Sequence, residues 1–158
     1  MSDLTVSVQN GICHLVISRP AKRNTIDAAT CLSWVKVLAQ AQKDDAVRCV
    51  IISGEETVFC AGADLQESLH RDEKIQQAYD ALIESMIAFD KPILAAVQGP
   101  AVGLGVAILC FCDMVYCGEK SLFSVFSMFS EVLKKRRGVP RKWKRQSASW
   151  SSRNAAIR

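Results

Sequence analysis

The chain has 158 residues, of which 49% are hydrophobic and 23% charged. This length and composition predict one globular core and exclude a collagen or a coiled coil. Seven cysteines stand beside two histidines, with an odd cysteine count and no CxxC pair. That pattern fits neither a secreted disulfide scaffold nor a zinc module, so we expect reduced thiols and no bound metal.

The net charge of +4 is distributed very unevenly along the chain. Residues 1–133 carry 10 Lys/Arg and all 16 Asp/Glu, whereas residues 134–158 carry the other 10 Lys/Arg and no acid. We therefore predict a core over residues 1–127 and a basic tail over residues 128–158. The tail is expected to be a solvated, disordered segment. Its Trp143 and Trp150 among basic residues leave open the binding of nucleic acid or an anionic surface.

Targeting and membrane signals are the next feature. The opening segment MSDLTVSVQN has neither an apolar signal region nor a basic transit pattern, and the final Ala-Ile-Arg is no peroxisomal address. The uncharged stretch 92–112 is divided at Gln98-Gly99-Pro100 into pieces shorter than the roughly 20 residues that a span needs. We expect a cytoplasmic protein by default, with no membrane span.

The expected elements alternate between strands and helices, which is typical of an α/β fold. Asn10-Gly11 readily takes positive φ angles and so predicts a hairpin with a type I′ turn. Leu32, Val35, Leu38 and Ala39 are expected to form the buried face of the first helix. In chain order we expect strands at 5–9, 12–18 and 49–53, a helix capped by Thr25 or Asp27 that ends near residue 42, a helix at 72–89, a strand at 92–97, a turn at 98–100, a helix at 102–111 and a strand at 114–117.

Two glycine-bearing loops, residues 60–64 and 99–105, each lie where a strand is expected to end and a helix to begin. Small residues let backbone N–H groups approach a ligand, and two such loops can converge on one oxygen atom. Close packing of helix on strand is the alternative reason for these glycines. A dinucleotide site is disfavoured because Ile108 stands where a third glycine is needed, and no Gly-Lys-Ser/Thr of a P-loop follows either loop.

Four segments of the chain, which include both loops, carry a likeness to a known family. They are Ser18-Arg19-Pro20-Ala21-Lys22-Arg23-Asn24, Phe59-Cys60-Ala61-Gly62-Ala63-Asp64-Leu65, Lys91 to Gly105 and Cys112-Asp113-Met114-Val115-Tyr116. These segments resemble the crotonase (enoyl-CoA hydratase/isomerase) family, and the likeness, which runs from about residue 4 to about residue 124, is closest to the enoyl-CoA isomerase-like branch. It implies an α/β fold that is a spiral of ββα units, assembly as a homotrimer or hexamer, and acyl-CoA thioesters as ligands.

The resemblance also implies where the ligand is held. The N–H groups of Ala63 and Leu104 would form an oxyanion hole for the thioester carbonyl oxygen. Lys22 and Arg23 would lie near the phosphates of coenzyme A, although solvated surface charge is the alternative for both. Coenzyme A would be part of the substrate, and no separate cofactor or metal is implied. The remaining expected contacts are backbone groups of Ala61, Gly62, Asp64, Leu65 and Gly103, with capping of a helix as the alternative for Asp64.

The acid/base residue is where this sequence departs from the family pattern. Hydratases of the family have a first glutamate at the position of Ala107, so hydratase chemistry by two glutamates is not expected. An isomerase shifts the double bond with one carboxylate, and Glu131 is the candidate here. From about residue 128 the likeness ends, and we expect a core that is incomplete relative to the family, produced by an altered reading frame or alternative splicing.

Two hypotheses about function remain open. The first is acyl-CoA binding with isomerase/hydratase-like chemistry of fatty-acid oxidation, a double-bond shift through an enolate. The second is a catalytically inactive crotonase-fold protein that acts through partner subunits or through an anionic partner of its tail.

Overall fold

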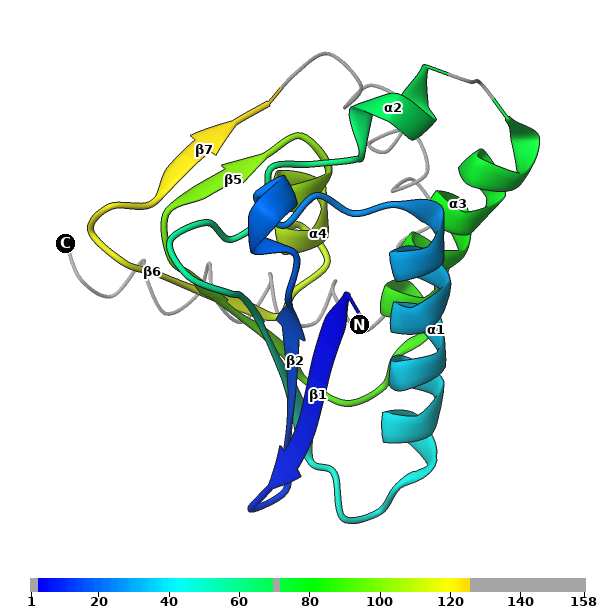
Figure 1. Cartoon of the computed structure of the whole chain (residues 1–158). Coiled ribbons are helices and arrows are strands. Elements are labelled where there is room, and N and C mark those ends of the chain that lie inside the picture. Colours follow the sequence, from blue (N-terminus) through cyan, green and yellow to red (C-terminus); the bar gives the residue numbers. More distant parts are fainter. Residues whose placement is uncertain (1–2, 70–71, 126–158) are drawn as a thin grey trace, which may run out of the picture. The chain divides into compact units, whose positions relative to one another are not determined.

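A computed structural model describes residues 3–69 and 72–125 of the chain (Figure 1). Glu131 and the basic tail over residues 128–158 lie outside the described residues, so what the sequence predicts of them stays a prediction. None of the described helices is long and apolar enough to cross a membrane.

A five-stranded sheet forms the centre of the described core. Its order is β1-β2-β3-β4-β6, and only the β1–β2 pair is antiparallel. The turn between these two strands contains Asn10 at φ 52° and Gly11 at φ 80°, which confirms the predicted hairpin. The strands are Leu4–Gln9 (β1), Ile12–Ile17 (β2), Cys49–Gly54 (β3), Ile93–Val97 (β4) and Met114–Cys117 (β6).

A second, two-stranded parallel sheet pairs β5, Pro100–Val102, with β7, Leu122–Ser124. The sequence predicted a turn at 98–100 that led directly into a helix at 102–111, and this was wrong. The helix α4 is shorter, Leu104–Leu109. The reason is that the preceding backbone pairs with distant segments, since the N–H of Gly103 donates to Ser124 O at 2.9 Å.

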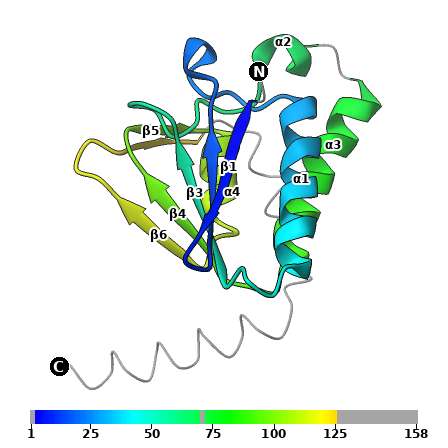
Figure 2. The same cartoon turned by 60° about the horizontal axis from the view of Figure 1, so that its bottom comes forward.

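The two long helices are α1, Ala28–Lys43, and α3, Glu73–Ala88, and they lie side by side on one side of the sheet (Figure 2). Asp27 caps α1 by accepting a hydrogen bond from the Thr30 N–H, which confirms one of the two predicted caps. The 3-10 turn η1, Pro20–Lys22, was not predicted. A helix was expected to begin after the loop at 60–64, and the short helix α2, Leu65–Ser68, begins there.

The buried face of α1 differs from the predicted one. Leu32 is 49% exposed and Ala39 is also exposed, although Leu38 is buried as expected. Trp34 points inward and is fully buried because its large ring covers more apolar area than a leucine or alanine can. The residues that α1 buries are Thr30, Cys31, Trp34, Leu38 and Ala41.

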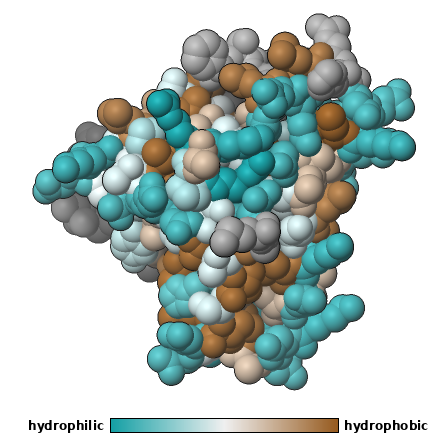
Figure 3. Space-filling model, viewed as in Figure 1, coloured by the Kyte–Doolittle hydropathy of each residue, from teal (hydrophilic) through white to brown (hydrophobic). Residues whose placement is uncertain are grey.

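The buried core includes apolar residues of β4 and α4. Val97, Ile108 and Leu109 belong to the same buried cluster as the residues of β2 and α1. Apolar side chains reach the surface elsewhere, on β6 and β7, and also on β1, where Val6 and Val8 are nearly half exposed. Figure 3 shows brown, apolar side chains among the polar ones on the face that includes β1.

The order of the elements fits the expected spiral of ββα units. Strands β1 and β2 are followed by α1, and strands β4 and β5 are followed by α4. The segments after β3 and β4 run beside one another, and the candidate site lies where they meet.

Candidate functional site

The two glycine-bearing loops lie side by side. Cys60 and Ala101 form a parallel bridge. The N–H of Cys60 donates to Pro100 O at 3.2 Å, and the N–H of Val102 donates to Cys60 O at 2.9 Å. Backbone hydrogen bonds thus join residues about forty positions apart. These bonds hold the two loops side by side.

Two glycines allow this approach. A Cβ on Gly105 would lie 2.7 Å from Cys60 O, closer than a real Cβ contact. A Cβ on Gly62 would lie 3.0 Å from Val102 O and 3.8 Å from the nitrogen of Leu104. Gly62 also has φ +105°, which side chains rarely adopt. The glycines therefore place the backbone before Ala63 against the start of α4.

The direction of the Ala63 N–H follows from its neighbours. Gly62 O accepts the N–H of Ile26 at 2.9 Å, and Ile26 O accepts the N–H of Asp64 at 2.9 Å. In a trans peptide the N–H points opposite to the carbonyl of the preceding residue. The Ala63 N–H therefore points away from Ile26, and no described residue accepts a hydrogen bond from it.

The Leu104 N–H is held in a similar way by the start of α4. Gly103 O accepts the N–H groups of Val106 and Ala107 at 3.1 and 3.0 Å, so the Leu104 N–H points out of the helix end. No acceptor for it occurs in the described part of the chain. A Cβ built on Gly103 would meet no described residue within 4 Å, so the described residues leave space beside this donor.

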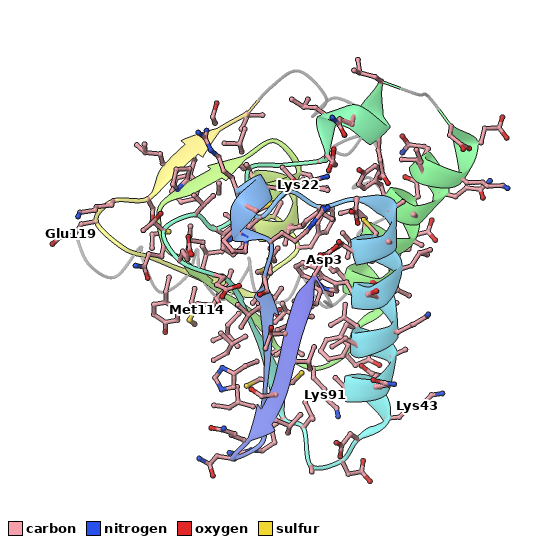
Figure 4. The ribbon with its side chains drawn as sticks, viewed as in Figure 1. Asp3, Lys22, Lys43, Lys91, Met114 and Glu119 are labelled. Carbon is pink, nitrogen blue, oxygen red and sulfur yellow. The ribbon has the colours of Figure 1, made fainter. Side chains whose placement is uncertain are left out.

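The two basic residues predicted near the ligand lie beside the first loop. Lys22 projects from η1, and its Nζ donates to Asp64 Oδ2 at 2.9 Å (Figure 4). Arg23 is exposed, and its carbonyl accepts the N–H of Ala61 at 3.1 Å. The structure thus brings Lys22, Arg23 and residues 61–65 together with Gly103 and Leu104.

Asp64 caps α2, because its Oδ1 accepts the Gln66 N–H at 3.1 Å. The hydrogen bond from Lys22 is the main cause that lowers the pKa of this carboxyl, although burial opposes it. A carboxylate with a lowered pKa is a weak proton acceptor. The geometry therefore favours the capping role of Asp64 over the role of a catalytic base.

A carboxylate for acid/base chemistry is not supplied by α4. Ala107, where the family resemblance implies the hydratase glutamate, is 3% exposed within this helix. Glu67 in α2 is engaged elsewhere, since its Oε2 accepts the Ala28 N–H at 2.8 Å. The described residues contain no group of three or more His, Cys, Asp or Glu that could hold a metal ion.

Sequence reasoning missed two residues that hold the segment leading into the first loop and the cap of α1. Asn24 is fully buried, and its amide donates to the carbonyls of Glu55 and Val58 at 2.9 and 2.7 Å. Arg19 pairs with Asp27 at 2.7 Å. Asn24 and Arg19 both lie in the Ser18–Asn24 segment that carries the family likeness, and that likeness was the available signal. The partners of Asn24 lie 31 and 34 residues further along the chain, so the sequence alone did not reveal them.

Comparison with known proteins gives the family. The Enoyl-CoA hydratase/isomerase family matches residues 7–130. The chain is 35% identical to 2,3-dehydroadipyl-CoA hydratase of Escherichia coli over 127 residues, 79% of this chain and 50% of that protein. It is 33% identical to 4-chlorobenzoyl coenzyme A dehalogenase-2 of an Arthrobacter species (77% and 48%) and 32% identical to the human Chromodomain Y-like protein (77% and 22%).

Solved structures agree with this result. A Pseudomonas aeruginosa protein superposes with a TM-score of 0.73 at 37% identity, covering 78% of this chain and 55% of that one. An enoyl-CoA hydratase from Mycobacterium avium subsp. paratuberculosis superposes with a TM-score of 0.69 at 30% identity, covering 77% and 46%. The chain belongs to the enoyl-CoA hydratase/isomerase, or crotonase, family, and it spans about half the length or less of the relatives named here.

Proposed function

We propose that the chain binds an acyl-CoA thioester and holds its carbonyl oxygen between the N–H groups of Ala63 and Leu104. The observation that carries this proposal is that two loops joined by backbone hydrogen bonds each leave one N–H group, that of Ala63 and that of Leu104, without an acceptor among the described residues. Membership of the crotonase family supports an acyl-CoA-related function of hydratase/isomerase type. Two relatives support the ligand class, since they are named for CoA compounds.

The chemistry we propose is a double-bond shift. Two N–H donors stabilise the negative charge that develops on the thioester oxygen when an α-proton leaves, by roughly 3 kcal/mol for each donor. One carboxylate would remove the proton from the α-carbon of a 3-enoyl thioester and return it to the γ-carbon, which yields the 2-enoyl isomer. Glu131 is the residue we propose for this step, with Lys22 and Arg23 near the phosphates.

The test of binding removes the N–H donor of Leu104 by a substitution that the local backbone tolerates. Leu104 is the first residue of α4, a position where proline is tolerated, and proline has no N–H. We expect Leu104→Pro to lose about tenfold in affinity for a 3-enoyl-CoA but little for free CoA, measured by calorimetric titration. Leu104→Ala keeps the donor and is the matched control.

Two results would contradict the proposal. One is that the unmodified chain binds the 3-enoyl-CoA no more tightly than free CoA. The other is that the proline and alanine variants lose the same affinity for the thioester. An absorbance assay for the shifted double bond, run on the same samples, separates turnover from binding alone.

A second candidate function is that of an inactive crotonase-fold protein that acts through a partner. The buried Ala107 favours it, because α4 offers no carboxylate where hydratases of the family have one. Under this candidate the thioester binds without turnover, or the basic residues of 134–158 bind partner subunits or an anionic polymer. Binding through the basic residues of 134–158 weakens steeply with salt, whereas the extra affinity that burial of an acyl chain gives a 3-enoyl-CoA over free CoA does not. A salt titration that compares 3-enoyl-CoA with free CoA therefore distinguishes thioester binding from binding through the tail.

A further inference from the structure

We propose that Cys60 is a positioning residue for the candidate site, because its thiol holds the Gly62–Ala63 peptide in the orientation that turns the Ala63 N–H outward. That this orientation serves ligand binding rests on the function proposed above. The orientation of the Gly62–Ala63 peptide does not rest on it, since it is a property of the protein without ligand.

The thiol of Cys60 contacts both ends of Gly62. Its Sγ accepts the Gly62 N–H at 3.3 Å and donates to Gly62 O at 3.8 Å. The same carbonyl accepts the Ile26 N–H at 2.9 Å. Two donors from different segments thus hold one carbonyl oxygen, and Gly62, at φ +105°, is a residue that would otherwise have wide conformational freedom.

Fixing that carbonyl fixes the next N–H. Gly62 O and the Ala63 N–H belong to the same planar trans peptide and point in opposite directions. A rotation of this peptide would turn the Ala63 N–H from its present direction, which is away from Ile26. The contact between the thiol and Gly62 O therefore acts on the geometry of the donor pair through one rigid group.

The thiol keeps its proton in this setting. Cys60 is fully buried, and burial raises the pKa of its thiol to about 12, so it remains a neutral S–H donor at physiological pH. Its thiol also lies beside α4, since a Cβ added to Gly105 would lie 3.3 Å from Sγ. Cys60 therefore lies between the two loops of the site. The competing explanation for its presence is that its side chain only fills the space between them.

Three variants separate positioning from filling. Cys60→Ala removes the donor and the acceptor, whereas Cys60→Ser retains both on a smaller atom. If Cys60 only fills space, the serine variant should behave like the alanine variant; if it positions the peptide, serine should restore the native properties. Cys13→Ala is the control for losing a thiol that is nearly as buried, because Cys13 is 2% exposed in β2.

The first measurement uses the full chain without ligand. In the unmodified protein we expect slow amide hydrogen exchange at Gly62 and fast exchange at Ala63. In Cys60→Ala we expect fast exchange at Gly62 and a changed N–H orientation at Ala63 in residual dipolar couplings, both restored in Cys60→Ser. Unchanged Ala63 couplings in Cys60→Ala, or fast exchange at Gly62 in the unmodified protein, overturn the inference.

The second measurement adds a 3-enoyl-CoA labelled with ¹³C at the thioester carbonyl and records its infrared stretch. We expect a lowered frequency in the unmodified chain and in Cys13→Ala, and a smaller shift in Cys60→Ala with about tenfold weaker binding. A thioester stretch that is unshifted in the unmodified chain contradicts the proposed function but not the positioning of the peptide. A full shift in Cys60→Ala overturns the positioning inference while leaving the proposed function intact.

Discussion

At the scale of single residues, the candidate site depends on two glycines, because any larger side chain would keep the loops apart. Gly62 and Gly105 have no Cβ, and this lets the loop at 60–64 contact the start of α4. The proposed ligand donors are main-chain N–H groups, so most side-chain substitutions leave them in place. Variants that shift the backbone are therefore the informative ones.

Gly105→Ala should destabilise the chain. The added Cβ would lie 2.7 Å from Cys60 O and 2.9 Å from Cys60 Cβ, and backbone cannot yield as a flexible side chain can. The overlap should cost about 1–3 kcal/mol, against the roughly 1 kcal/mol that alanine gains over glycine in a helix. We therefore expect a net loss in the free energy of unfolding, measured with urea. The control is Gly118→Ala, whose Cβ would lie 3.7 Å from Val97 O. An equal effect of both substitutions would contradict this reading.

Asp64→Asn should lower the free energy of unfolding at pH 7 by about 1–2 kcal/mol. The loss is kept small by solvent screening, because the partner Lys22 is half exposed. Asparagine still caps α2, so the loss reports the charge. The pKa of Asp64 is lowered in the folded chain, mainly by the hydrogen bond from Lys22. Its stabilisation is therefore fully present above the unfolded pKa of about 3.9 and disappears as the pH falls through the folded pKa.

Urea unfolding at a series of pH values checks this expectation for Asp64. The difference between the two proteins should be largest near neutral pH and should vanish in acid. Asp72→Asn is the matched control, because Asp72 caps α3 through the Lys74 N–H and is exposed. A difference that grows as the pH falls would contradict the assigned direction of the pKa shift.

At the scale of elements, α1 lies where the sequence predicted a helix, but the face that it buries was predicted wrongly. The cap at Asp27 and the end near residue 43 agree with the prediction, but the buried stripe is turned toward Trp34. The apolar residues of α1 are spread around more than one face, so periodicity alone selects no single stripe. Its contacts with α3 and with the sheet decide which side chains are covered.

Two leucines on this helix give a matched test. Leu38 is 1% exposed and Leu32 is 49% exposed. We expect Leu38→Ala to lower the free energy of unfolding by about 2–5 kcal/mol because it leaves a cavity, and Leu32→Ala to change it by about 0.5 kcal/mol or less. Thermal and urea unfolding measure both. Similar losses for the two variants would place the buried face where the sequence predicted it.

At the scale of the whole molecule, one guanidinium connects segments that are distant in sequence. The side chain of Arg19 is 10% exposed and lies 3.3 Å from Asp3, 2.7 Å from Asp27 and 3.8 Å from Asp64. These carboxylates stand before β1, at the cap of α1 and at the cap of α2. Arg19 thus ties the first loop of the site to the N-terminal hairpin and the first long helix.

Arg19→Ala should remove about 3 kcal/mol of stability at pH 7, since it leaves nearby carboxylates without their shared cation. The loss should shrink in acid as those carboxylates are protonated. Arg19→Lys should recover part of it, because lysine keeps the charge but lacks the fork of donors. Arg48→Ala is the control, since Arg48 is exposed and donates to Asn10 O. A loss no larger than that of the control would show that the cluster contributes little.

Much of this protein is determined locally. Asn10-Gly11 dictates the first hairpin, the Asp27 cap sets the start of α1, and apolar spacing locates α3, because turn geometry, capping and periodicity act within a few residues. The residues at 59–65 and 91–105 were also enough to identify the family. The position of the two loops against each other was inferred from that likeness.

Only the tertiary structure decided how those loops are built. The strands β5 and β7 pair across about twenty residues, and the peptide before Ala63 is held by Ile26 on one side and Cys60 on the other. The face that α1 buries likewise depends on α3. Such contacts join residues far apart in the chain, so local propensity carries no information about them, and their hydrogen bonds and close contacts exist only once the core has formed.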